Sequence, residues 1–122
     1  MQVPRPTDAD RERFHALVPE EPGVQVRPMF GNVAAFVNGN MFMGLLGADV
    51  GLRLNELDRQ LLRSEGGGPF GPGERPMAEY VSLPPDWLAD PFRCELWVAK
   101  ALDHARRMPA KEKSRKAKPG GA

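Results

Sequence analysis

The pattern of apolar and polar residues in the middle of the chain predicts a β-hairpin. Residues 33–37 and 41–46 are apolar-rich runs separated by Asn38-Gly39. This pair favours a two-residue type I′ turn, because both central residues of that turn need a positive φ angle. Alternating apolar residues predict a further strand over residues 24–27, stopped at the following proline, and another over residues 50–54.

Segments with helical spacing flank these strands. Residues 8–18 carry an apolar stripe and follow Thr7, which forms a capping-box pattern with Asp10. The spacing of leucines predicts a second helix over residues 56–64, and a third is expected over residues 91–107. In the third helix the residues expected on or near one apolar stripe are Phe92, Leu96, Ala99, Leu102 and Ala105.

The segment between the second and third helices contains a loop and one more strand. Residues 65–76 hold five glycines and three prolines and cannot form regular structure. A buried Phe70 would hold this loop against the core. Residues 77–83 predict a fifth strand, and Asp90-Pro91 is typical of a helix start. The order αββββαβα with short connections predicts a two-layer α+β fold with an antiparallel sheet.

Composition narrows the class of protein. A length of 122 residues suits one domain. No apolar run approaches the ~20 residues of a membrane-spanning helix. The first six residues lack the apolar region of a secretion signal. The single cysteine, Cys94, cannot form an internal disulfide, which suits the reducing cytoplasm. We therefore expect a cytoplasmic protein.

Charge is distributed unevenly along the chain. The net charge is +1, but the segment from Arg106 onward carries seven basic residues and one acidic residue, Glu112. After Pro109 no apolar residue larger than alanine occurs, which predicts a folded domain over residues 1–108 and a disordered basic tail over residues 109–122. Such a tail either binds nucleic acid weakly and without sequence preference or keeps the protein soluble. The tail has no aromatic residue for base stacking, which favours the second interpretation.

The residue types needed for catalysis or metal binding do not cluster in the sequence. Cys94 precedes His104 by ten residues in one predicted helix, so the two cannot be adjacent there as a nucleophile and its base. His15 and His104 lack the short spacing of zinc ligands. The glycine-rich loop follows a helix and leads to a strand, whereas a phosphate-binding loop needs a strand before it and a helix after it. We predict no catalytic residue, no metal site and no cofactor.

A series of short motifs in the chain resembles one protein family. Their order and spacing over residues 8–106 are similar to those of the N-terminal domain family of the bacterial TfoX/Sxy competence regulators. The resemblance implies a curved antiparallel sheet like that of secretion chaperones, and it implies no established enzymatic activity. The motifs are Met29-Phe30-Gly31, Asn38-Gly39, Met41-Phe42, Leu52-Arg53-Leu54, Pro69-Phe70, Arg75-Pro76-Met77, Tyr80, Pro84, Leu88, Trp97-Val98, Ala101-Leu102 and Ala105.

The hairpin suggests where a partner would bind. Large apolar residues stand at consecutive strand positions, and successive side chains of a strand point to opposite faces of a sheet. One layer of helices covers only one face. We therefore predict an interaction surface formed by Phe36, Met41, Phe42 and Met43, used by a protein partner or by a homodimer.

These observations predict a small cytoplasmic, non-enzymatic interaction or regulatory module. One alternative is a transcription regulator that binds nucleic acid through its basic tail. A second alternative is a small enzyme with an unrecognised site near residues 29–31 and Arg53.

Overall fold

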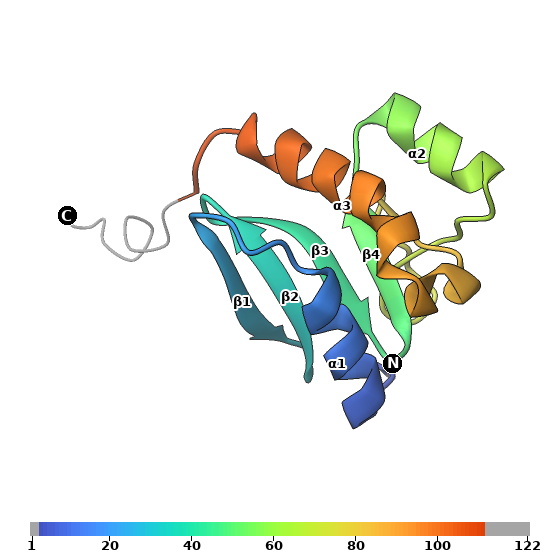
Figure 1. The fold of residues 1–122 in the computed structure, drawn as a ribbon. Helices are drawn as coiled ribbons and strands as arrows, with labels where there is room; N and C mark the ends of the chain where they lie inside the picture. Colours follow the sequence, from blue (N-terminus) through green and yellow to red (C-terminus); the bar gives the residue numbers. More distant parts are fainter. Residues whose placement is uncertain (1–2, 112–122) are drawn as a thin grey trace.

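Five strands form one open antiparallel sheet in the computed structural model, which describes residues 3–111 (Figure 1). The strands are neighbours in the sheet in their chain order, β1-β2-β3-β4-β5. This arrangement confirms the predicted α+β fold. The elements are α1 (Asp8–Leu17), β1 (Val24–Met29), β2 (Asn32–Val37), β3 (Asn40–Leu46), β4 (Asp49–Arg53), α2 (Glu56–Ser64), β5 (Tyr80–Ser82), the 3-10 helix η1 (Pro85–Ala89) and α3 (Pro91–Arg106).

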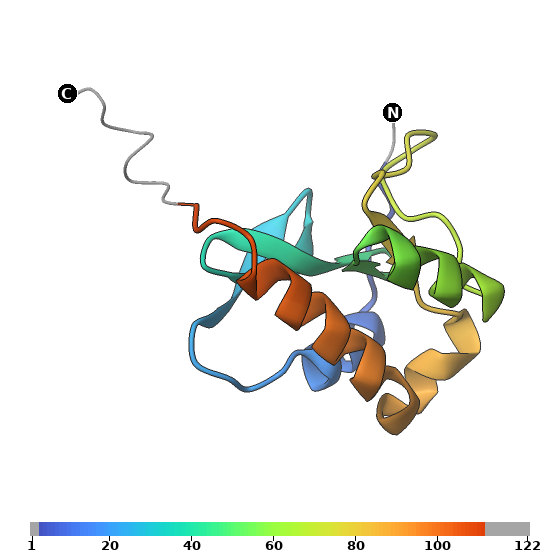
Figure 2. The same cartoon turned by 90° about the horizontal axis from the view of Figure 1, so that it is seen from above.

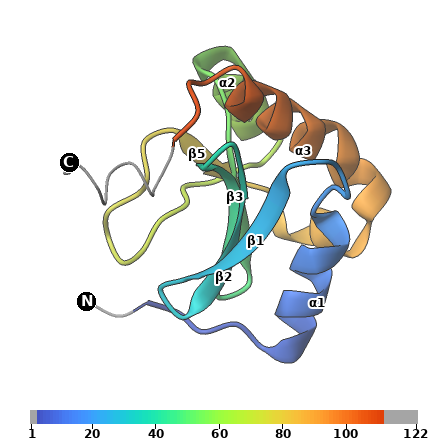
Figure 3. The same cartoon turned by 90° about the vertical axis from the view of Figure 1, so that its left-hand side faces the viewer.

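The sheet has a different cover on each face (Figure 3). α1 and α3 lie on one side of it, and the segment between α2 and β5 lies on the other. The core between the sheet and the helices includes Phe14 of α1, Leu52 of β4 and Val98 of α3. Phe14 is fully buried, whereas Trp97 is only partly buried against the same core. Figure 2, a view from above, shows α3 running across the sheet. In the described part of the chain, no helix combines the length and apolarity that a membrane crossing requires.

Two type I′ turns connect β1, β2 and β3. Asn38 and Gly39 have φ angles of 53° and 77°, which agrees with the turn predicted from their sequence. Phe30 and Gly31 have φ angles of 52° and 76° and join β1 to β2 in the same way. This second turn could not be predicted from the residue types, because a phenylalanine rarely adopts a positive φ angle.

β1 continues through Pro28 to Met29, so the prediction that this strand stops at the proline is wrong. Met29 and Asn32 are the hydrogen-bonded pair that closes the two-residue turn, and the next pair, Pro28 and Val33, is therefore not hydrogen-bonded. The ring nitrogen of Pro28 points away from β2. Because β1 is an edge strand, the missing N–H group removes no bond from the sheet.

A β-bulge in β3 changes the face on which two large side chains lie. The register shifts between the pairs Ala35↔Met43 and Phe36↔Met41, so Phe42 is the extra residue of β3. Phe42 and Met43 both belong to the core on the helix side, and each is 0% exposed. The strict alternation assumed from the sequence fails here, and these two members of the predicted interaction surface are buried.

α3 turns to the core a face that matches the predicted stripe only in part, because Leu102 and Ala105 are buried as expected whereas Ala99 is exposed. Phe92 and Leu96, which the spacing placed on the apolar stripe, are 85% and 63% exposed. The helix instead packs mainly small side chains toward the sheet, which lets the two layers come close together. Its buried residues are Cys94, Val98, Ala101, Leu102 and Ala105. In α2, likewise, Leu62 is buried whereas Leu57 and Leu61 are exposed.

The ends of several elements follow local hydrogen bonding. The capping box of α1 forms as predicted, since the Thr7 N–H donates to Asp10 Oδ2 at 2.8 Å and the Asp10 N–H donates to Thr7 Oγ1 at 3.1 Å. The bond from the Thr7 backbone is the main cause that lowers the pKa of Asp10. Asp90 makes no side-chain cap for α3, although Pro91 stands in the first turn. β5 is shorter than predicted, and Met77 packs against the Phe70 side of the sheet instead of pairing in the ladder.

The glycine-rich segment covers the second face of the sheet through Phe70. This side chain is 2% exposed, as predicted, and its ring centroid lies 5.9 Å from that of Tyr80. The ring sits directly over Gly51, where an added Cβ atom would come within 2.2 Å of a ring carbon. The absence of a side chain at Gly51 therefore makes room for Phe70.

The C-terminal segment stays attached to the sheet beyond the predicted domain end at residue 108. Asn40 Nδ2 donates to the Pro109 carbonyl at 2.9 Å, and the Lys111 N–H donates to the Asn38 carbonyl at 2.8 Å. Asn40 is 1% exposed, so its amide is committed to this contact. Residues 109–111 are thus not part of a free tail, and residues 112–122 of the predicted tail lie outside the described residues.

We expect Gly51→Ala to lower the free energy of unfolding by about 1–3 kcal/mol, the usual cost of overpacking a core. Phe70→Ala should lower it by about 3–5 kcal/mol, because a buried ring is lost. Both changes act on one contact, so the double variant should lose less than the sum of the single losses. Urea denaturation of the four proteins measures these differences. Strictly additive losses would contradict the placement of Phe70 on Gly51.

Candidate functional site

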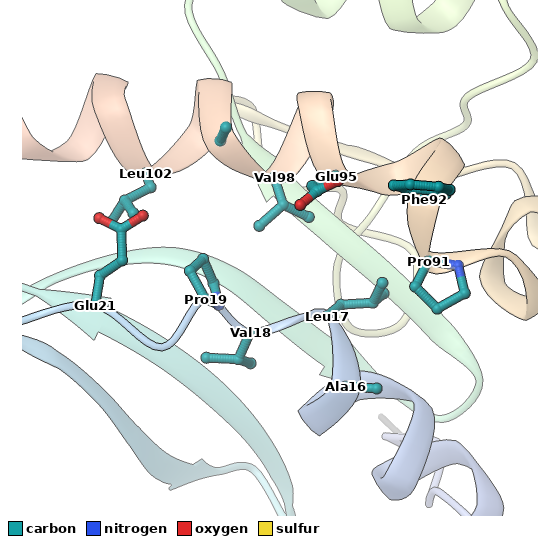
Figure 4. A pocket seen from close by; sticks show the side chains of 11 residues that line it. Ala16, Leu17, Val18, Pro19, Glu21, Pro91, Phe92, Glu95, Val98 and Leu102 are labelled. Carbon is teal, nitrogen blue, oxygen red and sulfur yellow. The ribbon is translucent and has the colours of Figure 1, made fainter.

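A groove lies between the end of α1 and α3 (Figure 4). Its volume is about 360 Å3. Leu17, Val18 and Pro19 form one wall, where the chain leaves α1, and Val98 and Leu102 of α3 contribute to the other. The groove is therefore apolar along most of its length.

Local sequence explains how each wall is made. Val18 ends α1 with extended φ and ψ angles of −71° and 126°, and Pro19 then prevents the helix from continuing. The chain consequently runs as an extended segment past α3. On α3, the residues that line the groove share one helical face through their spacing. They are Pro91, Phe92, Glu95, Val98, Ala99 and Leu102.

Two carboxylates stand among the apolar residues of the groove. Glu21 Oε1 accepts a hydrogen bond from Arg106 Nη1 at 2.8 Å, and Arg106 Nη2 donates to the Pro22 carbonyl at 3.1 Å. These bonds tie the α1–β1 segment to the end of α3. Among the described residues no basic side chain forms an ion pair with Glu95. Glu95 thus leaves a negative charge at the edge of an apolar groove.

The groove is lined by apolar side chains and two carboxylates. Its lining residues include no serine, cysteine, histidine or lysine that could act as a nucleophile or base. An apolar group can pack between its walls, and a cation attached to that group can pair with a carboxylate. The sequence did not point to this groove, because its walls come from segments about 80 residues apart and because Phe92 was expected in the core.

The four residues of the predicted interaction surface do not lie on one exposed patch. Phe36 and Met41 are half-buried and face away from α1 and α3, opposite each other in the β2–β3 ladder. Phe42 and Met43 are in the core on the helix side. Within the chain itself, only Phe36 and Met41 of this set contact solvent.

The two halves of the predicted alternative enzyme site lie at opposite ends of the sheet. Residues 29–31 form the β1–β2 turn, whereas Arg53 lies near the β2–β3 turn, where its Nη1 donates to the Met41 carbonyl at 3.4 Å. Arg53 Nε also donates to Glu79 Oε1 at 2.7 Å, and this bond lowers the pKa of Glu79. Burial raises the pKa of the neighbouring Tyr80 to about 12. The structure does not bring the two halves together.

Asp49 and Cys94 are two further groups whose pKa values are shifted. Burial raises the pKa of Asp49, but neither hollow that it lines contains a serine, cysteine, histidine or lysine. Cys94 is fully buried, and its Sγ donates to the Trp87 carbonyl at 3.3 Å. Burial raises the pKa of Cys94 to about 11. Within residues 3–111, no group of three or more histidine, cysteine, aspartate or glutamate side chains is placed to hold a metal ion.

We expect Cys94 to resist thiol reagents in the folded protein. At a pH of about 8 only a small fraction of a thiol with this raised pKa is the reactive thiolate, and the side chain is also inaccessible. Titration with 5,5′-dithiobis(2-nitrobenzoic acid) should show slow labelling in buffer and rapid labelling of one thiol in denaturant. Rapid labelling of the folded chain would contradict the burial of Cys94.

Comparison with known proteins gives one family. The family model described as the TfoX N-terminal domain matches residues 12–105, from within α1 to within α3. The comparison with curated proteins finds no match. The matched region contains the whole sheet, the Phe70 segment and both walls of the groove. The chain therefore belongs to the TfoX N-terminal domain family.

Proposed function

We propose that this chain is a non-enzymatic regulatory module that binds a protein partner through the groove between α1 and α3. Membership in a domain family of competence regulators supports a regulatory role. The observation that carries the proposal is Phe92, whose side chain is 85% exposed at the edge of an apolar groove. Large apolar side chains exposed together with an apolar groove are typical of interaction sites.

The chemistry of the groove suggests the kind of partner. An apolar side chain of the partner would pack against Val98 and Leu102, and a neighbouring lysine or arginine would pair with Glu95. An amphipathic helix offers both groups on one face, at the spacing used in helix-in-groove recognition. A partner helix of this kind would also cover the ring of Phe92.

A binding role fits the groove better than a catalytic one. A catalytic site needs a nucleophile, base or metal ligand next to the bound group, and the lining residues include none beyond the two glutamates. As part of the same proposal, the module acts in the bacterial cytoplasm, where the free thiol of Cys94 stays reduced.

A homodimer through the hairpin has less support than the groove. Phe42 and Met43 are buried in the core, so aspartate at either position would unfold the domain instead of breaking an interface. A second copy of this chain remains an alternative occupant of the groove, and the size of a cross-linked product identifies it.

Photo-crosslinking from position 92 tests the proposal. We expect the chain with benzoylphenylalanine in place of Phe92 to give a discrete cross-linked product in cells that make the protein naturally. The same amino acid in place of Leu57, which is exposed on α2, serves as the matched control and should give none. Adding Ala99→Arg should abolish the product, because its side chain would fill the groove.

Equal yields from positions 92 and 57 would overturn the proposal, as would a product that Ala99→Arg leaves unchanged. Ala99 is exposed on α3, and arginine is a good helix former, so this variant should keep its fold. Circular dichroism of the purified variant checks this point.

A further inference from the structure

A second hollow lies on the other face of the sheet, beside the cluster around Phe70. It is lined by Gln25 and Arg27 of β1, Phe36 of β2, the Asn38-Gly39 turn and Lys111, and its volume is about 450 Å3. Phe36 belongs to the predicted interaction surface and is half-buried here. The hollow shares no residue with the groove between α1 and α3.

Arg27 is held in position within this hollow. Its guanidinium carbon lies 4.8 Å from the centre of the Phe36 ring. Its Nη2 donates to Gln25 Oε1 at 2.8 Å. The ring of Phe36 and the side chain of Gln25 therefore hold the guanidinium in position at the hollow.

The fold brings the basic C-terminal segment to the same place. The Asn40 side chain binds the Pro109 carbonyl, and the Lys111 N–H binds the Asn38 carbonyl. Gly39 allows this close approach, because a Cβ atom at this position would come within 2.0 Å of the Lys111 carbonyl oxygen. These contacts hold Lys111 beside the Asn38-Gly39 turn, where it lines the same hollow as Arg27 and Phe36.

The charge of the hollow is positive. Arg27 and Lys111 line it, and no lining residue is acidic. These two side chains give the hollow a positive charge that complements phosphate groups, and it contrasts with the carboxylates of the groove.

We propose that this hollow binds single-stranded nucleic acid. Lys111 contacts a phosphate, and an unpaired base stacks on the guanidinium of Arg27. A duplex keeps its bases inside the stack, so the hollow fits a single strand. Unlike binding by a free basic tail, this binding depends on the folded positions of Arg27, Phe36 and Asn40.

Fluorescence anisotropy with the full chain tests the site. The probe is a fluorescein-labelled oligothymidylate of about 12 nucleotides at about 50 mM salt. Arg27→Gln should weaken binding about fivefold or more, the loss expected when one stacked base is released. Arg63→Gln removes the same charge from an exposed position of α2 and should change the affinity by less than about twofold. Lys111→Gln, which removes a phosphate contact, should reduce the slope of log K against log salt by about 0.7.

Asn40→Ala changes no charge and tests whether binding depends on the position of residues 109–111. It removes the donor to Pro109, and we expect it to weaken binding by a factor similar to that of Arg27→Gln. Should this variant fail to fold by circular dichroism, Lys111→Gln replaces it, with the same expected direction. Equal effects of Arg27→Gln and Arg63→Gln would overturn the proposal. Equally tight binding of a duplex, or of inorganic polyphosphate at the same phosphate concentration, would also overturn it.

Discussion

The contact between Phe70 and Gly51 allows one short chain to bury both faces of its sheet. α1 and α3 cover one face, and the other face also carries apolar side chains such as Leu46 and Tyr80. The segment that covers them has too many glycines and prolines to form a helix or strand, so a single aromatic ring provides most of the cover. Gly51 accepts that ring because it has no side chain. Without this contact, the face around Tyr80 would be exposed to water.

Covering both faces determines which surfaces remain for partners. Phe42 and Met43 turn into the helix-side core at the bulge of β3, and the Phe70 segment takes up Met41 and Met77 on the other side. The two hollows that remain lie at the edges of these covering layers. On the helix side it is the groove beside Phe92, and on the opposite side it is the hollow around Arg27.

Short sequence motifs predicted those features that depend on residues close together in the chain. The Asn38-Gly39 turn, the capping box at Thr7 and the burial of Phe70 all follow from residue types at fixed short spacing. The bulge at Phe42 does not, because the choice between strict alternation and an extra residue depends on which face needs the larger side chain. The buried face of α3 was predicted only in part, since Leu102 lies on it as expected whereas the large side chains of Phe92 and Leu96 are exposed.

Neither candidate site could be predicted from the sequence, because each joins segments that are distant in the chain. Asn40 reads as a turn-flanking polar residue, yet its side chain binds Pro109, 69 residues away. Pro19 predicts the end of a helix from the sequence alone. It forms part of a groove wall only because α3 lies opposite it in the fold. Such pairings depend on tertiary packing, which residue spacing along one segment does not encode.

The edge strand β1 offers few free backbone groups for pairing with another strand. The turn at Phe30-Gly31 makes Val24, Val26 and Pro28 the residues of β1 whose backbone groups point outward. The Val24 N–H donates to the Glu21 carbonyl at 3.2 Å, and Pro28 has no N–H group. Val26 is then the only one of the three with a free outward donor, and addition of another strand needs a run of them. The groove and the hollow lie on opposite faces and share no residue, so two different partners can occupy them together.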